Sequence, residues 1–277
     1  ICWLLGAREP SRRFQTAAQA LGIPVLREIP RAVECLKTIF SQRAASIPPP
    51  ADTPLPSTVA ERLGSARGAL DEHRSKKVLA DCGIPVVAER IVATPAAAAA
   101  AAAKWGYPVV LKGLVPGAVH KTEQGLVRLG IASATALDSA FDELAAAMDG
   151  KGEILLQQMV HGGPELIAGG LRDPQFGPCV MCGLGGTLAE ILGDAAFAVA
   201  PLSREDALAL VGRLKTRQLL DGFRGAPPVD REALAEILVR LGRLMAAFPA
   251  IREIDINPLI CANGRPLAVD ASIILAD

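Results

Sequence analysis

Apolar and polar positions follow two periods along the chain, and the period predicts the element at each place. Residues 1–43 read as strand, helix, strand and helix, which is the order of a βαβα unit. A Pro-rich stretch without periodicity follows at 46–60, and such a composition is typical of a linker. We therefore expect a short domain remnant over 1–43, a linker over 44–60 and a larger folded region from residue 61 onward.

The larger region divides into two lobes of the α/β class. Over 61–150, helical periodicity alternates with strand-like runs, which predicts a compact first lobe. Over 151–277, several apolar runs are joined by short turns, which predicts antiparallel strands together with two helices. Thr94 and Ser203 have the sequence context of helix N-caps, and a third helix is expected to start after Asp230.

One strand of the second lobe carries an unusual set of side chains. In REIDINPLI (252–260), Glu253, Asp255 and Asn257 alternate with apolar residues. A β-strand would place these three polar side chains on one face, because successive side chains point to opposite sides. The turn ANGR, which follows between two apolar-rich runs, is a strong signal for a β-hairpin.

The hairpin predicts the neighbours of this strand. Symmetry about Asn263–Gly264 places Asn257 directly opposite Asp270. Asp255, Asn257 and Asp270 then lie within reach of one another, and they offer only oxygen ligands, which suit Mg²⁺. The alternative interpretation is a solvated strand face that binds nothing.

Composition narrows the class of protein. Lys plus Arg and Asp plus Glu each number 29, so the formal net charge is zero and favours neither nucleic acid nor an anionic membrane. No apolar run reaches the roughly 20 residues of a membrane helix. The CxxC pair Cys179 and Cys182 lies in an apolar run and is predicted to be two buried free thiols, and a metal or redox site is the alternative. The six scattered cysteines fit a reducing cytoplasm. Since the chain begins with Ile, we expect it to be part of a longer cytoplasmic protein.

Further features could bind an anion or carry chemistry. Lys112 ends an apolar strand, where an ammonium could reach a phosphate, and the glycines of GLGG (183–186) allow close backbone approach to an anion. Arg224 lies in a glycine-flanked loop and could clamp a phosphate or carboxylate. His120 lies in a glycine-containing loop, a context that permits a phosphorylated or general-base histidine. Lys112 and Arg224 can also be interpreted as ordinary solvated side chains, and GLGG lacks the lysine of a P-loop. His73 is predicted to lie at the surface.

Seven segments occur in a characteristic order: SKKVLADCGIPV, GYPVVLKG, VHKTEQG, LLQQMVHGGPELIAGGLRDPQFGP, GLGGTLAE, LLDGFRG and EIDINPLI…AVDA. Together they resemble the ATP-grasp module of NDP-forming acyl-CoA synthetases, the family of ADP-forming acetate–CoA ligase. This family is related to the β subunit of succinate–CoA ligase. The resemblance covers 61–277 and implies an ATP-grasp fold, with two lobes around a nucleotide cleft. Residues 1–43 resemble the end of the flavodoxin-like CoA-ligase domain that precedes ATP-grasp in fused members.

The resemblance also implies roles for individual positions. It assigns Mg²⁺ to Asn257 and Asp270, with Asp255 beside them. It assigns phosphoryl transfer to His120. Arg224 is a further catalytic candidate, because a loop arginine could clamp a phosphate. It assigns ATP or ADP binding to Lys112, to the hinge residues Gln158, Met159 and Val160 and to Glu165. Gly183, Gly185 and Gly186 are further ATP-binding candidates, because their backbone could approach a phosphate.

The family reaction converts acid, CoA and ATP into acyl-CoA, ADP and phosphate through an acyl phosphate and a phosphohistidine. The resemblance therefore implies partners, namely CoA-binding and phosphohistidine domains on the same full-length chain or on a partner subunit, and we expect an oligomer. One alternative is the regulatory, ligase-like module of a protein-lysine acetyltransferase. Another is an ATP-grasp carboxylate–amine ligase, which the HKTEQG loop disfavours. The acid, and the choice between ADP and GDP, stay open.

Overall fold

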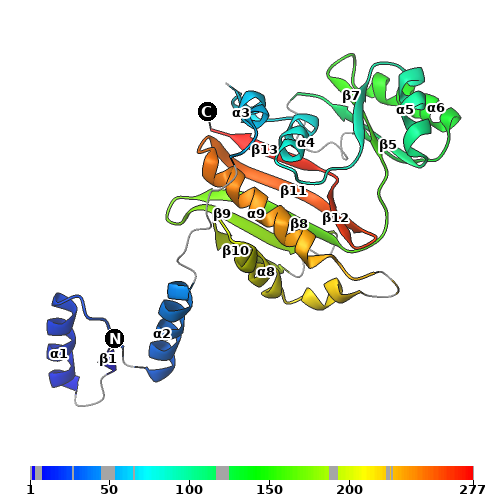
Figure 1. Ribbon diagram of the computed structural model, residues 1–277. Coiled ribbons are helices and arrows are strands. Elements are labelled where there is room, and N and C mark those ends of the chain that lie inside the picture. The colour runs from blue at the N-terminus through cyan, green and yellow to red at the C-terminus, as the bar shows by residue number, and fades with distance from the viewer. Residues whose placement is uncertain are drawn as a thin grey trace. The chain divides into compact units, whose positions relative to one another are not determined.

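The computed structural model describes residues 2–3, 8–26, 28–44, 54–64, 66–116, 125–186, 193–222, 225 and 227–276. It divides the chain into two compact units, Ile1–Pro49 and Pro50–Asp277 (Figure 1). Two predicted catalytic residues, His120 and Arg224, lie outside the described residues.

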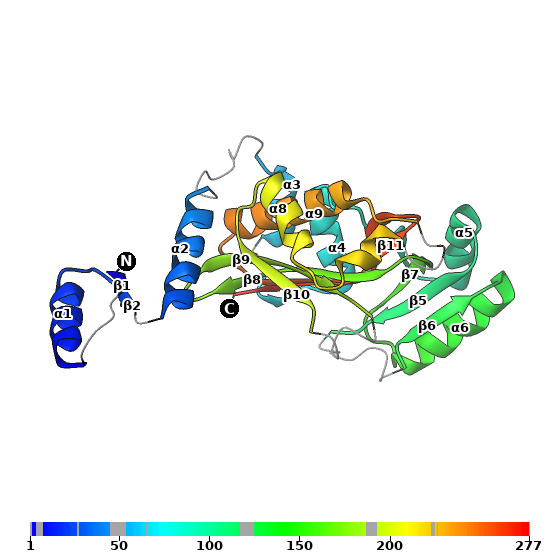
Figure 2. The ribbon, with the colours of Figure 1, turned by 90° about the horizontal axis from the view of Figure 1, so that it is seen from below.

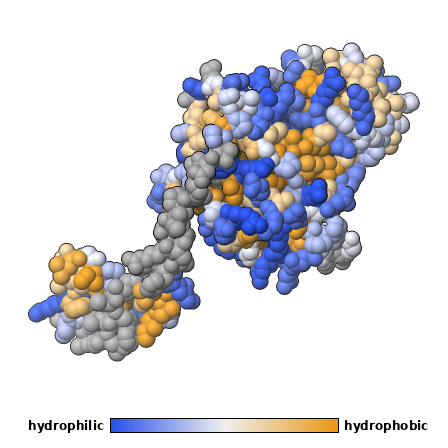
Figure 3. All heavy atoms as spheres, in the orientation of Figure 1, coloured by the Kyte–Doolittle hydropathy of each residue, from blue (hydrophilic) through white to orange (hydrophobic). Residues whose placement is uncertain are grey.

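The first unit has the strand–helix–strand–helix order that the sequence predicts. Its strands, β1 (Cys2–Trp3) and β2 (Val25–Leu26), pair in parallel, and its helices are α1 (Arg8–Ala20) and α2 (Ile29–Ala44). A parallel pair requires a crossover, and α1 supplies it. Several large apolar side chains of this unit are exposed, and apolar patches are visible on its surface (Figure 3). The flavodoxin-like assignment stays a prediction.

The second unit contains a larger sheet whose strands all pair in antiparallel fashion. Its order is β10-β9-β8-β11-β13-β3, and β12 pairs with β11 at the side of this path. The strands are β3 (Gly68–Ala69), β8 (Glu165–Asp173), β9 (Gly177–Leu184), β10 (Ala195–Val199), β11 (Ile251–Ala262), β12 (Arg265–Ala268) and β13 (Ala271–Leu275).

Helices cover one face of this larger sheet, as Figure 2 shows from below. They are α3 (Ser57–Leu63), α4 (Glu72–Asp81), α8 (Arg204–Gly212) and α9 (Arg231–Ala247), and a short 3₁₀ helix, Arg217–Asp221, follows α8. The apolar residues of β11, such as Ile254 and Ile256, are buried in this core, whereas Asp255 and Asn257 retain exposure. Covering one face of an antiparallel sheet thus produces the alternation seen in the sequence.

A smaller antiparallel sheet completes the second unit. Its order is β4-β7-β5-β6, with β4 (Glu89–Val92), β5 (Val109–Leu114), β6 (Val127–Ile131) and β7 (Glu153–Gln158). The helices α5 (Pro95–Trp105) and α6 (Ala134–Ala147) pack on it and on each other. As expected, α5 begins after the N-cap Thr94, whose Oγ1 accepts a hydrogen bond from the backbone N–H of Ala97, and α8 begins with a capping box at Ser203.

The arrangement differs from the sequence-based expectation in three places. The strand β7 pairs with β4 and β5, so it completes the smaller sheet, although the sequence placed it at the start of the second lobe. The helix α4 and strand β3 belong with the larger sheet, although they fall in the predicted first lobe. The helix α3 begins at Ser57, inside the stretch read as a linker. Which strands pair depends on packing between segments that are distant in the chain, and a local sequence pattern does not reveal this packing.

In the described part of the chain, no helix is both long and apolar enough to cross a membrane.

Candidate functional site

The acidic strand, β11, carries Glu253, Asp255 and Asn257, and it pairs with β13 in the predicted register. Asp255 pairs with Ser272 and Ile256 with Ala271, which brings Asn257 opposite Asp270. The backbone N–H of Asn257 donates to the carbonyl of Asp270 over 3.2 Å. The hairpin at Asn263–Gly264 therefore fixes the neighbours of this strand, as the sequence indicated.

Negative charge is concentrated on this face of the larger sheet. Burial raises the pKa of Asp255, and the carboxylates of Glu253 and Asp270 raise it further. A cation bound here would relieve this repulsion, and carboxylate and amide oxygens are suitable ligands for Mg²⁺. Among the described residues, no group of three or more His, Cys, Asp or Glu side chains could hold a metal ion. A metal bound beside Asp270 would therefore need further oxygens from elsewhere, such as water or phosphate.

Lys112 brings a positive charge to the same place. It lies in β5 of the smaller sheet and is only 6% exposed. Its Nζ donates to Oε1 of Glu72 over 2.6 Å and to Oδ2 of Asp270 over 3.1 Å. Burial alone would lower the pKa of Lys112, but the carboxylates of Asp270 and Glu72 outweigh burial and raise it. The ammonium is therefore charged, and it joins the two sheets at the acidic strand.

A buried network of charged side chains lies behind Lys112, and sequence reasoning missed it. At its centre is Lys76 of α4, which is fully buried. Its Nζ donates to Glu72 Oε1 over 2.8 Å, to Gln157 Oε1 over 3.0 Å and to the carbonyl of Val269 over 3.1 Å, and it forms an ion pair with Glu89. These partners come from α4, from β4 and β7 of the smaller sheet and from the turn before β13 of the larger sheet, so the network connects the two sheets.

The histidine expected at the surface belongs to this network. Nδ1 of His73 lies 2.7 Å from Oε1 of Glu89, and only 15% of its side chain is exposed. The surface reading of His73 was therefore wrong. A local signal for the network did exist: Glu72 and Lys76 are four residues apart, on the same helix face as the buried Leu79.

The predicted hinge residues lie where the chain passes from one sheet to the other. Gln158 ends β7 in the smaller sheet, and β8 of the larger sheet begins at Glu165. The side chain of Gln158 donates to the carbonyl of Trp105, and the backbone N–H of Met159 donates to that of Pro108. Val160, which follows, is partly exposed. This segment is thus attached to the smaller sheet, and its role in binding adenine stays a prediction.

The glycines at the end of β9 and directly after it have a packing reason for lacking side chains. A Cβ at Gly185 would lie 2.9 Å from the carbonyl oxygen of Leu166, and one at Gly183 would lie 2.9 Å from that of Asp194. Gly186 has φ +74° and lies beside the carboxylate of Glu165. The structure therefore brings Glu165 and Gly186 together at the start of β8, while their contact with a nucleotide stays a prediction.

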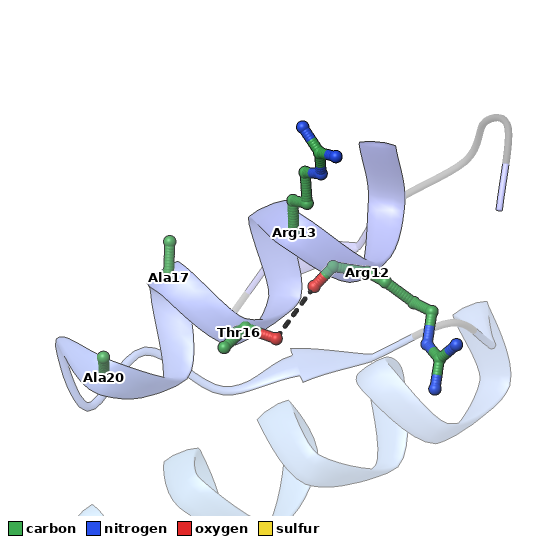
Figure 4. A pocket seen from close by; sticks show the side chains of 5 residues that line it. All are labelled: Arg12, Arg13, Thr16, Ala17 and Ala20. Carbon is green, nitrogen blue, oxygen red and sulfur yellow. Dashed lines mark hydrogen bonds between the residues drawn. The ribbon is translucent and has the colours of Figure 1, made fainter. Parts of the chain in front are cut away.

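Two other candidate features carry no functional argument. In the first unit, a shallow hollow on α1 is lined by Arg12, Arg13, Thr16, Ala17 and Ala20, and its two arginines point in different directions (Figure 4). In the CxxC pair of β9, both cysteines are free and buried, as predicted.

Comparison with known proteins identifies the family of this chain. The model of the ATP-grasp domain family matches residues 61–275. The beta subunit of an ADP-forming acetate–CoA ligase I from Pyrococcus furiosus is 38% identical over 223 residues, which cover 78% of this chain and 96% of that subunit. A trans-feruloyl-CoA synthase from an unknown prokaryotic organism is 33% identical over 98% of this chain, but the match spans only 39% of that protein.

A solved structure is also similar. It is the dinucleotide-forming acetyl-coenzyme A synthetase 1 of Ca. Korarchaeum cryptofilum, in complex with coenzyme A and Mg-AMPPCP. The TM-score is 0.68 at 40% identity, and the match covers 79% of this chain and 97% of that one. These ligases and synthetases give no support to the acetyltransferase alternative. The chain belongs to the ATP-grasp family, in the group that includes the beta subunits of ADP-forming acetate–CoA ligases.

Proposed function

We propose that this chain is the Mg·ATP-binding, phosphoryl-transferring part of an ADP-forming acyl-CoA synthetase. One observation carries the proposal: the charged ammonium of Lys112 lies 3.1 Å from Asp270, beside an acidic strand face, where the two sheets meet. A metal-bound polyphosphate requires a cationic side chain for its phosphate oxygens and carboxylates for its metal ion, and both are present here. The similar solved structure with a bound Mg-AMPPCP supports this reading.

In this proposal, the residues of the chain position the phosphates and neutralise their charge. Asp270, Asn257 and Asp255 would hold Mg²⁺, which when bound neutralises charge on the phosphate oxygens. Lys112 would exchange its contact with Asp270 for one with a phosphate oxygen. Such positioning and electrostatic stabilisation are most of what phosphoryl transfer requires from a protein.

The remaining expected roles follow the family resemblance. The segment Gln158–Val160 would hold adenine, and His120 would accept the phosphoryl group and pass it on, with Arg224 in support. Acyl-CoA formation from acid, CoA and ATP would then need CoA-binding and phosphohistidine modules, on the same full-length chain or on a partner subunit. The 39% coverage of the similar synthase agrees with this division of labour.

Calorimetric titration of Mg·ATP tests the proposal. We expect the unaltered chain to bind, and Asn257→Ala and Asp270→Ala each to weaken binding at least tenfold, about 1.4 kcal/mol. Asp138→Ala, an exposed position on α6, is the matched control and should bind like the unaltered chain. Absence of binding by the folded chain, or unchanged affinity in both Asn257→Ala and Asp270→Ala, would overturn the proposal.

A further inference from the structure

The carboxylate of Glu72 is shared between two lysines. Its Oε1 accepts from Lys112 over 2.6 Å and from Lys76 over 2.8 Å, and only 1% of its side chain is exposed. Hydrogen bonds to charged groups are shorter and stronger than neutral ones, and burial removes the competition from water. Glu72 is therefore a strong partner for the Lys112 ammonium.

Neighbouring elements hold Glu72 in position. It lies in the first turn of α4, which packs on β13, the strand that follows Asp270. Lys76, one turn further along the same helix, is held in turn by Gln157, Glu89 and the carbonyl of Val269. The Glu72 carboxylate is thus fixed from one side, while Lys112 approaches it from the smaller sheet.

The charges within this cluster are balanced. Glu72 and Glu89 provide two buried carboxylates, and Lys76 and Lys112 provide two buried ammonium groups. Lys76 keeps Glu89 as a partner if the charge of Glu72 is removed, and Lys112 keeps Asp270. The loss of Glu72 would therefore release the Lys112 ammonium on one side without leaving either lysine unpaired.

We propose that Glu72 is a positioning residue for nucleotide binding: it holds the Lys112 ammonium at the meeting point of the two sheets, directed at the place beside Asp270 where a phosphate would bind. This inference rests on the proposed function, because it assigns the phosphate contact to Lys112. When Lys112 turns from Asp270 to a phosphate, its contact with Glu72 would keep it in place. Binding geometry prepared in advance avoids the cost of ordering a long side chain on binding.

A double-mutant cycle on the full chain tests the proposal, with affinity for Mg·ATP measured by titration to millimolar nucleotide. The single variants are Glu72→Gln and Lys112→Met, and the cycle is closed by the variant that carries both changes. Glu72→Asp is the second variant at this position, since it keeps the charge in the core but withdraws the carboxylate by one methylene. Adenosine, which has no phosphate, is titrated beside Mg·ATP.

The matched control is Asp81→Asn. Asp81 ends the same helix and pairs with Arg62, with 2.6 Å between Arg62 Nε and its carboxylate. It lies nine residues from Glu72, about 13 Å along the helix axis. The control therefore makes the same acid-to-amide change and breaks an ion pair of α4 away from Lys112.

We expect Glu72→Gln and Glu72→Asp to weaken Mg·ATP binding about tenfold and to leave adenosine binding and the Asp81→Asn control unchanged. In the Lys112→Met background, the change at Glu72 should have less than about a twofold effect. Two outcomes would assign Glu72 a general structural role and overturn the inference. One is an equal loss of Mg·ATP affinity in the unaltered and Lys112→Met backgrounds, and the other is a loss of adenosine affinity as large as that of Mg·ATP affinity. Unchanged or tighter Mg·ATP binding would overturn it too. If the unaltered chain fails to bind Mg·ATP, the proposed function itself fails, so the two failures are distinguishable.

Discussion

Replacing Lys76 by Met is expected to destabilise the second unit strongly. The Lys76 side chain is 1% exposed, and it has two carboxylate partners, Glu72 and Glu89. It also donates to Gln157 and to the carbonyl of Val269. Methionine has a similar length and helix propensity, so the substitution removes the charge and its hydrogen bonds but little volume.

The magnitude follows from the burial of the network. Removing one partner of a buried ion pair costs about 3–5 kcal/mol, because the remaining charge stays buried without compensation. Here Glu72 retains Lys112, and Glu89 retains His73, so we expect the lower end, about 3 kcal/mol. For a domain of 150–250 residues this corresponds to a melting temperature lowered by roughly 6–12 °C.

Thermal and urea unfolding of Lys76→Met beside Lys77→Met measure this effect. Lys77 is the next residue on α4 and is exposed, so the same substitution there should change the unfolding free energy by no more than about 0.5 kcal/mol. Adding Glu89→Gln to Lys76→Met should restore part of the loss, because it removes a carboxylate left in excess. If Lys76→Met and Lys77→Met unfold alike, the buried network contributes no net stability and the reasoning is wrong.

Three further predictions concern other parts of the second unit. Gly163→Ala should destabilise it more than Gly162→Ala in urea unfolding, since both have φ +82° but only a Cβ at Gly163 would overlap the carbonyl of Cys261; equal losses would contradict this. Burial opposes a low pKa for Asp194, but hydrogen bonds from the 215–216 segment hold that pKa below its ordinary value. Asp194 therefore stabilises the fold above the unfolded-state pKa, and this stability is lost as the pH falls through the lower folded pKa. In Asp194→Asn, the unfolding free energy should thus fall less steeply as the pH is lowered from about 5 to about 3. An unchanged slope would refute this role of Asp194. Burial raises the pKa of Cys182 and Cys261 to about 12, so mass spectrometry should find neither labelled by a thiol reagent at about pH 8 in the folded protein, and labelling of either would contradict their burial.

Local sequence determined the features that depend on neighbouring residues. The Asn263–Gly264 turn set the register that places Asn257 opposite Asp270, because a short hairpin allows few pairings. Thr94 and Ser203 marked helix starts, because a cap bonds to N–H groups within its own turn. The alternation along β11 indicated which of its faces is buried.

Tertiary structure alone decided how the site is assembled. Lys112 read as a single polar residue at the end of an apolar strand, yet its partners, Glu72 and Asp270, lie 40 and 158 positions away in the chain. The membership of β7 in the smaller sheet and the contact of the partly buried His73 with Glu89 were equally hidden. A hydrophobic period shows which face of an element is buried but not what it is buried against. The free energy of a buried charge depends on that partner, so the charged network could be recognised only once distant segments had been brought together.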